Sequence, residues 1–287
     1  MWFTYTILSV LALGIGYTLF KFPALHNQNR FASTFWSNLV SSVIVGVIIL
    51  FFSPSSLTLI TTNVVWFSLL WGLVFSLNMF FYISALKEMY ANVLFPIASA
   101  ISTVFVVGVG FLFLSDTVSF MKLAGIMVIL AFVYLLNKKG GKIVLNKNLS
   151  FYFLGIVITS FFVKYFQKVL IDLSGDPIAV MLPEYISASL FAFIFGYIFY
   201  KKNFMTALIK KQEIKSGTII AVPLFVGAYF LVSALNIGEL SQVFAIHPVY
   251  VVVVTLLTSL FFKEKLGFKK LLIILGIVVG IILIKIG

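Results

Sequence analysis

The sequence contains few charged residues and no cysteine. Charged residues make up 10% of the 287 residues, whereas they make up about 25% of an average soluble domain. Without cysteine the chain cannot form disulfides, use thiol catalysis or bind metals through thiolates. It has two histidines, His26 and His247, and no HExxH-like spacing, so we expect no metal site. No segment resembles the GxxxxGK[ST] nucleotide-binding loop, so we expect no cofactor and no use of ATP.

Hydrophobic residues account for 62% of the chain, against about 45–50% in soluble domains. This excess predicts an integral membrane protein with the lipid bilayer as its solvent. The net charge of +12 comes from lysines in short connectors between apolar segments, as the positive-inside rule produces. We therefore expect no nucleic-acid partner. The apolar segment that starts at Met1 lacks a basic n-region and a cleavage site, so we interpret it as a retained helix.

The chain contains apolar segments long enough to cross a membrane, which needs about 20 mostly apolar residues. Ten segments qualify, the fifth being short: Trp2–Phe20, Ala32–Phe52, Val64–Leu86, Val93–Leu114, Met121–Leu136, Phe151–Ile171, Ile178–Tyr200, Gly217–Leu235, Gln242–Phe262 and Leu266–Ile286. The longest connectors, Ser53–Asn63, Asn137–Ser150 and Lys201–Ser216, leave no room for a soluble domain. The sequence predicts an all-α polytopic membrane protein of ten transmembrane helices; nine spans and a surface helix are the alternative.

An internal repeat supports ten spans. "FLFLSDTVSFMKLAGI" (Phe111–Ile126) and "SLFFKEKLGFKKLLII" (Ser259–Ile274) each combine an apolar helix, a turn with an acidic residue and Phe-x-Lys-Leu at the next helix. Asp116 corresponds to Glu264. Since each half would hold five helices, an odd number, the halves would have opposite orientations in the membrane. We predict two inverted five-helix repeats, residues 1–137 and 151–287, joined by the basic linker 138–150.

Charges in equivalent connectors agree with this inversion. Ser53–Asn63 is uncharged, whereas its counterpart Lys201–Ser216 carries five lysines. Inverted repeats are common in secondary transporters, which bind solutes near the membrane midplane between the halves. The lysines of the linker 138–150 predict a cytoplasmic linker and both termini outside. Oligomeric state stays open, since ten helices can enclose a pathway alone.

Several short motifs resemble the drug/metabolite transporter superfamily, and its EamA-like branch most closely. Ala-Leu ends the third helix of each half (Ala85-Leu86 and Ala234-Leu235), and a proline lies in the fourth helix of each half (Pro96 and Pro248). An acidic residue lies in the last turn of each half (Asp116 and Glu264), and a Gly-x-Gly-Tyr stretch (Gly14–Tyr17) precedes Lys21. The resemblance covers the whole chain and implies a multi-pass membrane transporter of small solutes, in a bacterial inner membrane. Asp116 departs from the usual glutamate, and members often have cytoplasmic termini, contrary to the charge distribution here.

Charged and titratable residues inside spans are costly and usually face a cavity or a partner. Lys164 and Glu184 could form an ion pair or bind a substrate, and His247 and Glu184 could carry protons. Lys168, close to its helix end, is expected to reach the headgroups.

Further candidates share polar or aromatic side chains within spans, and three prolines are expected to kink their helices. The substrate-binding candidates beside the charged residues are Asn38, Trp71, Asn78, Tyr82 and Gln167, and the kink candidates are Pro96, Pro223 and Pro248. Tyr229, like Trp71 and Tyr82, is a candidate to face the cavity.

These features favour a secondary transporter of small metabolites such as amino acids, an exporter or exchanger that works by alternating access, with or without proton coupling. The alternative is a membrane-embedded enzyme acting on a lipid or small solute. Such enzymes need clustered His, Asp or Glu, and the sequence shows no such cluster. We therefore expect no enzymatic activity. A polytopic receptor or channel is disfavoured because the inverted repeat suits alternating access better than a fixed pore.

Overall fold

The computed structural model consists of helices and connectors over the residues that it describes, which are all except 89, 114–115, 118, 138–146, 263–267 and 287. The helices are α1 (Trp2–Leu19), α2 (Lys21–Leu25), α3 (Arg30–Phe52), η1 (Pro54–Leu59), α4 (Thr62–Ala85), α5 (Ala91–Phe113), α6 (Phe120–Asn137), α7 (Lys147–Ser174), α8 (Pro177–Leu208), α9 (Lys211–Ile237), α10 (Leu240–Ile246), η2 (His247–Val249), α11 (Tyr250–Phe262) and α12 (Phe268–Ile286).

Within the described residues, every apolar segment expected from the sequence is helical over most of its length. The short fifth segment gains one residue at each end as α6. Within the described residues seven helical stretches are long and apolar enough to cross a membrane: Trp2–Leu25, Arg30–Phe52, Thr62–Ala85, Asn148–Ser174, Pro177–Leu208, Lys211–Ile237 and Leu240–Phe262. Two shorter apolar helices, Ile101–Leu112 and Phe120–Phe132, lie in α5 and α6. The protein is therefore an all-α, multi-pass membrane protein.

The predicted connector Lys201–Ser216 differs most from the structure. The segment Lys201–Ser216 was expected to be a connector, but α8 continues to Leu208 and α9 starts at Lys211. α8 is kinked at Lys201, whose backbone is not helical (φ 44°, ψ −122°), and helical residues lie on both sides of this kink. The lysine-rich composition indicated the end of an apolar span, and it did not exclude helix beyond it.

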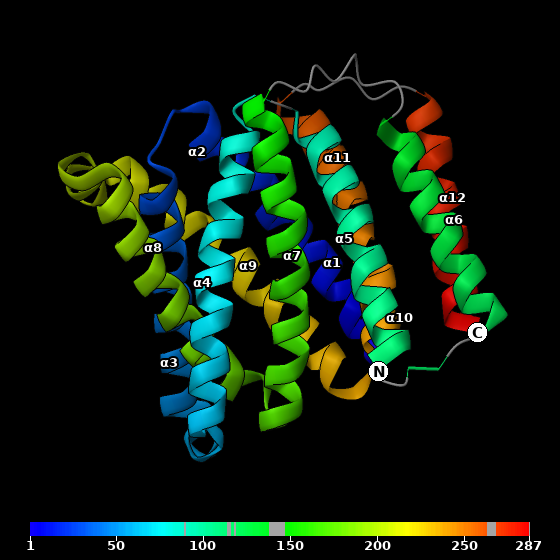
Figure 1. Ribbon diagram of the computed structural model, residues 1–287, viewed down its shortest axis with the longest axis horizontal. Coiled ribbons are helices and arrows are strands. Elements are labelled where there is room, and N and C mark those ends of the chain that lie inside the picture. Colours follow the sequence, from blue (N-terminus) through cyan, green and yellow to red (C-terminus); the bar gives the residue numbers. More distant parts are fainter. Residues whose placement is uncertain (89, 114–115, 118, 138–146, 263–267, 287) are drawn as a thin grey trace.

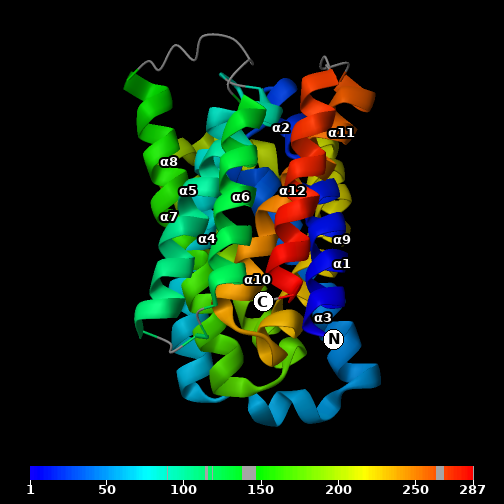
Figure 2. The same cartoon turned by 90° about the vertical axis from the view of Figure 1, so that its right-hand side faces the viewer.

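The long helices form one bundle with an appended pair (Figure 1). α1 packs along α9, α4 packs along α7, and α3 packs along α8. α6 and α12 pack on each other at one edge (Figures 1 and 2). Both chain termini lie towards one end of the bundle, which we call the terminal end; α6 stops and α7 starts at the opposite end, which we call the linker end.

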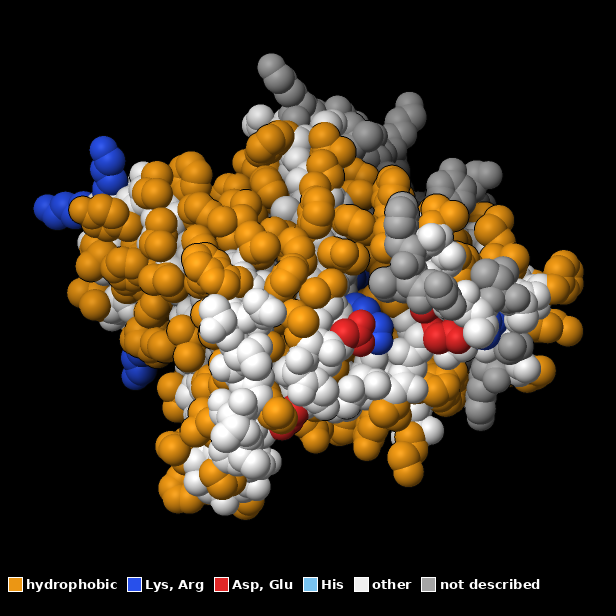
Figure 3. All heavy atoms as spheres, turned by 60° about the horizontal axis from the view of Figure 1, so that its bottom comes forward, with side chains coloured by type: hydrophobic (Ala, Val, Ile, Leu, Met, Phe, Trp, Pro, Cys, Tyr) orange, Lys and Arg blue, Asp and Glu red, His pale blue; other side chains and the backbone are white. Residues whose placement is uncertain are grey.

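The outer surface of the bundle is mostly apolar. Large side chains such as Phe52, Trp66 and Leu50 are exposed on it, and hydrophobic side chains cover most of the face in Figure 3. In water such a surface would be unfavourable by about 25 cal/mol for each Å². In a bilayer it faces lipid tails.

α4 and α8 approach each other closely at Gly72. A Cβ atom on Gly72 would lie 2.2 Å from the Ser187 Oγ and 2.6 Å from the backbone N of Ala188. By contrast, nothing lies within 4 Å of a Cβ atom placed on Gly46 of α3. The absence of a side chain at Gly72 therefore allows these two helices, one from each half of the chain, to pack backbone to backbone.

The expected kink at Pro248 is present. The apolar stretch from Leu240 to Phe262 is divided into α10, the 3₁₀ turn η2 and α11, with Pro248 in the turn. Proline lacks a backbone N–H and clashes with the carbonyl four residues earlier, which interrupts the helix. Pro96 and Pro223 lie inside α5 and α9, both of which continue as single helices.

Candidate functional site

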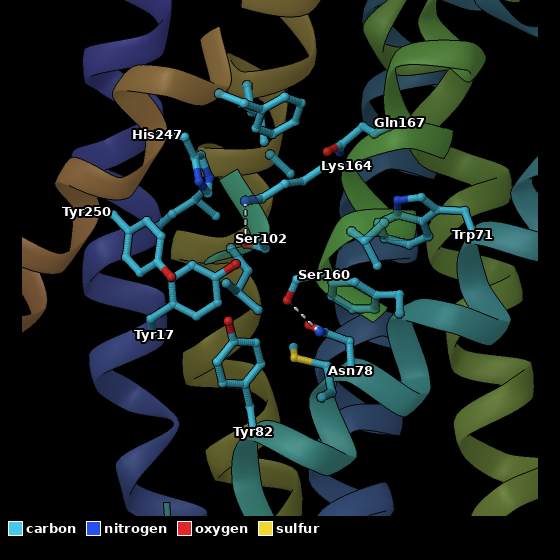
Figure 4. A pocket seen from close by; sticks show the side chains of 18 of the residues that line it. Tyr17, Trp71, Asn78, Tyr82, Ser102, Ser160, Lys164, Gln167, His247 and Tyr250 are labelled. Carbon is cyan, nitrogen blue, oxygen red and sulfur yellow. Dashed lines mark hydrogen bonds between the residues drawn. The ribbon is translucent and has the colours of Figure 1, made fainter. Parts of the chain in front are cut away.

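A cavity lies inside the bundle and is lined from both halves of the chain (Figure 4). It contains about 760 Å³ of space between atoms, counting the part that is open to the outside. α1, α4, α5 and α7 to α11 contribute the lining, with η2. The lining residues are Leu13, Tyr17, Trp71, Phe75, Asn78, Met79, Tyr82, Ser102, Ser160, Val163, Lys164, Gln167, Tyr185, Leu224, Ala228, Leu231, Phe244, His247 and Tyr250.

Lys164 carries the positive charge of the cavity. α7 projects its side chain into the bundle, where it is 7% exposed. Its Nζ donates to the Ser102 Oγ at 2.8 Å and lies 3.4 Å from the Thr103 Oγ1, both on α5. It also lies 5.5 Å from the ring centroid of Phe244 on α10. The ammonium thus has only neutral partners.

Asn78 connects α4 to α7 beside the cavity. Its Nδ2 donates to the Thr159 Oγ1 at 2.8 Å and to the Ser160 Oγ at 2.9 Å. Thr159 in turn donates to the carbonyl of Gly155, one turn back. Both hydroxyls come from α7, so one amide holds the two cavity walls at a fixed spacing (Figure 4).

Two cavity residues have buried polar atoms without a protein partner. The Trp71 Nε1 and both ring nitrogens of His247 are buried and have no hydrogen bond to the described protein groups. Buried polar groups are nearly always hydrogen-bonded, so such exceptions require an explanation. Because both side chains line the cavity, water or a bound solute in it can satisfy them.

Six of the eight substrate-binding candidates line the cavity and two do not, and the cavity candidate Tyr229 does not line it either. Trp71, Asn78, Tyr82, Lys164, Gln167 and His247 are brought together there. Glu184 is only 1% exposed but is not among the lining residues, and its Oε1 has no hydrogen-bond partner among the described protein groups. Asn38 donates to the carbonyl of Thr34 in its own helix.

The suggested ion pair between Lys164 and Glu184 does not form. Lys164 donates instead to hydroxyls of α5, and the Glu184 Oε1 has no partner among the described protein groups. Tyr185, the neighbour of Glu184, lines the cavity instead. Consecutive helical residues point about 100° apart, so Glu184 cannot share the direction of Tyr185. Lys168 pairs with Asp172 at 2.7 Å and also donates to the carbonyl of Leu235.

Sequence reasoning missed several lining residues. Tyr17, Ser102, Ser160, Tyr185 and Tyr250 are hydroxyl-bearing and line the cavity. Figure 4 shows the hydroxyls of Tyr17 and Tyr82 directed towards the same space as Lys164. A usable signal was the helical spacing of polar residues, since Ser160, Lys164 and Gln167 are four and three residues apart and fall on one face.

Polar contacts join the two halves at the terminal end. The Asp116 Oδ2 accepts from the backbone N–H of Ser241 at 2.7 Å. The Glu239 carboxylate accepts from the Thr117 hydroxyl at 2.7 Å and pairs with Lys122 at 3.2 Å. Partial burial alone would raise the pKa of Glu239, but the bonds from Thr117 and Lys122 outweigh it and lower that pKa below its usual value.

Comparison with known proteins agrees with the sequence resemblance. Residues 147–286 match the EamA-like transporter family, which confirms the resemblance drawn from the motifs. A solved crystal structure is similar over 98% of this chain and 98% of its own, with a TM-score of 0.78 and 14% sequence identity. At that identity the similarity concerns the fold alone. None of the curated proteins compared with the chain matches it.

Proposed function

Since the chain belongs, through the match over residues 147–286, to the EamA-like transporter family, we propose that it is a secondary transporter. It moves small metabolites such as amino acids, as an exporter or exchanger, through the central cavity. The halves 1–137 and 151–287 move relative to each other and expose the cavity to either side in turn. The protein functions as a multi-pass protein of the cell membrane, in a bacterial inner membrane.

The central cavity is the observation that carries this proposal. Polar side chains inside a membrane protein are expensive and are kept where they face a pathway or a partner. Here the Trp71 Nε1 and the His247 ring nitrogens are buried without protein partners and line a cavity between the two halves. A cavity of this kind between repeats is where secondary transporters bind their solutes.

Helix packing supports the two inverted repeats. If α1, α3, α4, α5 and α6 correspond to α7, α8, α9, α10–α11 and α12, the most extensive contacts between the halves have counterparts. α1 packs on α9 as α7 packs on α4, α3 packs on α9 as α8 packs on α4, and α1 packs on α11 as α7 packs on α5. α1 starts at the terminal end and α7 at the linker end, in opposite directions (Figure 1).

Ten spans follow from the same correspondence. Seven helical stretches in the described part meet the length and hydropathy of a span. α5, α6 and α12 supply the remaining three, of 23, 18 and 19 residues. At 1.5 Å for each residue, 18–19 residues reach about 27–29 Å, close to the ~30 Å hydrocarbon core.

Glu184 and His247 are our candidates for proton coupling. His247 lines the cavity, where a proton on its ring can meet the solute. Glu184 lies beside the lining residue Tyr185 and is buried, with its Oε1 unpartnered. A carboxyl group without a salt-bridge partner can accept and release a proton as its surroundings change. Pro248, next to His247, divides the helix there and provides the point where that wall can bend.

The test is counterflow of a pooled metabolite mixture in proteoliposomes, with and without a pH gradient. We expect solute exchange that responds to the gradient and loses that response in Glu184→Gln. Asp172→Asn, an exposed carboxylate on α7, serves as the control and should keep it. Exchange that ignores both the gradient and the variant would contradict proton coupling through Glu184. Absence of flux for every solute would contradict transport itself, and chemically altered solutes would favour the membrane-enzyme alternative.

A further inference from the structure

We propose that the cavity selects solutes that carry a carboxylate and no cationic group, attached to an apolar, preferably aromatic body. This inference rests on the proposed transport function and narrows its solute class. It follows from the position of Lys164, from the aromatic composition of the cavity wall, and from the polar atoms of Trp71 and His247 in that wall that have no protein partner.

The charge of the cavity is one-sided. Lys164 is the only Lys, Arg, Asp or Glu among the described residues that line it. Its ammonium has three N–H donors, and two neutral oxygens, on Ser102 and Thr103, lie within 3.4 Å of it. A third donor is therefore available for another acceptor. The carboxylate of Glu184, which precedes the lining residue Tyr185, does not pair with the Lys164 ammonium.

A buried charge without a counter-ion is unfavourable, because desolvation costs several kcal/mol for each ion. A solute carboxylate would supply the missing negative charge. Charge-assisted hydrogen bonds between ammonium and carboxylate are about twice as strong as neutral ones. An ammonium-bearing solute would instead meet a like charge at Lys164 and find no carboxylate among the lining residues. The same lysine therefore attracts one solute class and repels the other.

Neutral donors elsewhere in the cavity wall can add hydrogen bonds to a bound solute. The Trp71 indole can only donate, and its Nε1 is buried without a partner. Gln167 lies one turn after Lys164 on α7 and also lines the cavity. Figure 4 shows the Lys164 ammonium beside His247, whose ring nitrogens are also without a protein partner, and Trp71 on the other side of the open space.

The rest of the wall is aromatic. The aromatic lining residues other than His247 are Tyr17, Trp71, Phe75, Tyr82, Tyr185, Phe244 and Tyr250. Ring faces and edges of this kind pack well against another planar ring. The cavity thus offers a charged site on one side and apolar surface on the other, which matches an arylalkyl carboxylate.

The test compares three ligands that share a phenylethyl body: 3-phenylpropionate (carboxylate only), phenylalanine (zwitterion) and phenethylamine (cation). Binding to the purified full-length protein is measured by titration calorimetry. We expect 3-phenylpropionate to bind at least 10-fold more tightly than phenethylamine, with phenylalanine between them. Lys164→Gln should weaken binding of 3-phenylpropionate at least 10-fold and leave phenethylamine unchanged or tighter. Lys168→Gln, one turn away and paired with Asp172, should leave the order unchanged.

The wild-type order is informative even if Lys164→Gln does not fold. Tighter binding of phenethylamine than of 3-phenylpropionate would overturn the inference, as would binding of none of the three ligands. An equal loss of affinity in Lys168→Gln and Lys164→Gln would also overturn it. The counterflow assay judges transport separately, so flux of other solutes by a protein that fails this test would refute the selectivity and leave the transporter standing.

Discussion

The close approach of α4 and α8 at Gly72 gives a quantitative prediction for Gly72→Ala. The added Cβ would lie 2.2 Å from the Ser187 Oγ, and 2.6 Å from both the backbone N of Ala188 and the backbone C of Ser187. Overpacking costs about 1–3 kcal/mol. We expect the upper end, because two of the three atoms are backbone and cannot rotate away.

Helix propensity works in the opposite direction. Alanine favours a helix over glycine by about 1 kcal/mol, so Gly72→Ala should destabilise the protein by about 2 kcal/mol net. At roughly 2–4 °C for each kcal/mol in chains of 150–250 residues, the melting temperature in detergent should fall by about 4–8 °C. Gly46→Ala, where a Cβ meets nothing within 4 Å, should leave it unchanged or raise it by about 2–4 °C.

The assay is thermal unfolding of the two purified variants, followed by intrinsic fluorescence and by size-exclusion profiles. Equal melting temperatures for Gly72→Ala and Gly46→Ala would refute the reasoning, because only the first site is tightly packed. A fall in Gly46→Ala as large as in Gly72→Ala would refute it as well. Since α4 carries Trp71, Asn78 and Tyr82, we expect Gly72→Ala also to weaken solute binding.

Three further predictions concern orientation, polar packing and pH. The chain has no cysteine, so a single introduced cysteine can report on which side of the membrane it lies. Described lysines are concentrated towards the linker end, which the positive-inside rule places in the cytoplasm. Ser55→Cys should therefore react with an impermeant maleimide in intact cells and Lys202→Cys only after permeabilisation, and the reverse pattern would contradict this orientation. Asn78→Leu should lower the stability of the protein by about 1 kcal/mol, since interhelical hydrogen bonds in membranes contribute about 0.6 and at most about 1.7 kcal/mol. Asn38→Leu removes a bond within its own helix, so its melting temperature should lie nearer to that of the wild type. The pKa of Glu239 is lowered in the fold, so its contribution to stability is present above the usual glutamate pKa and lost as pH falls through the lower folded value. Melting curves at decreasing pH should therefore show a drop that is smaller in Glu239→Gln; an identical drop would remove Glu239 as its cause.

The helices were predictable because the length of each apolar segment can be counted in the sequence. Part of the site was predictable as well, because few polar residues occur inside these segments. Trp71, Asn78 and Tyr82 fall on one face of α4 at helical spacing, and all three line the cavity. Phe75 lies on the same face but could not be singled out among 33 phenylalanines. Side-chain chemistry and spacing together were enough for these positions.

The direction that a helix faces was not predictable. Glu184 seemed the better candidate because it is charged, yet its neighbour Tyr185 faces the cavity. Each residue turns the helix by about 100°, and a helix that is apolar on all sides provides little information about its rotation. The same limit applies to Asn38, which is buried but bonded within α3. The turn at Lys201 was missed for another reason, since a left-handed lysine has no signature in composition.

The contact between Lys164 of α7 and Ser102 of α5 has a counterpart at the other side of the cavity. There the ring of Tyr17 of α1 packs against that of Tyr250 of α11, tilted by 37° and with ring centroids 4.7 Å apart. The cavity is therefore asymmetric, because one wall holds the ammonium of Lys164 and another holds the rings of Tyr17 and Tyr250. Two identical subunits related by a twofold axis would repeat every group on both sides, and two facing ammonium groups would repel each other. A single chain whose halves differ in sequence avoids this repulsion and can keep one cation opposite an aromatic pair.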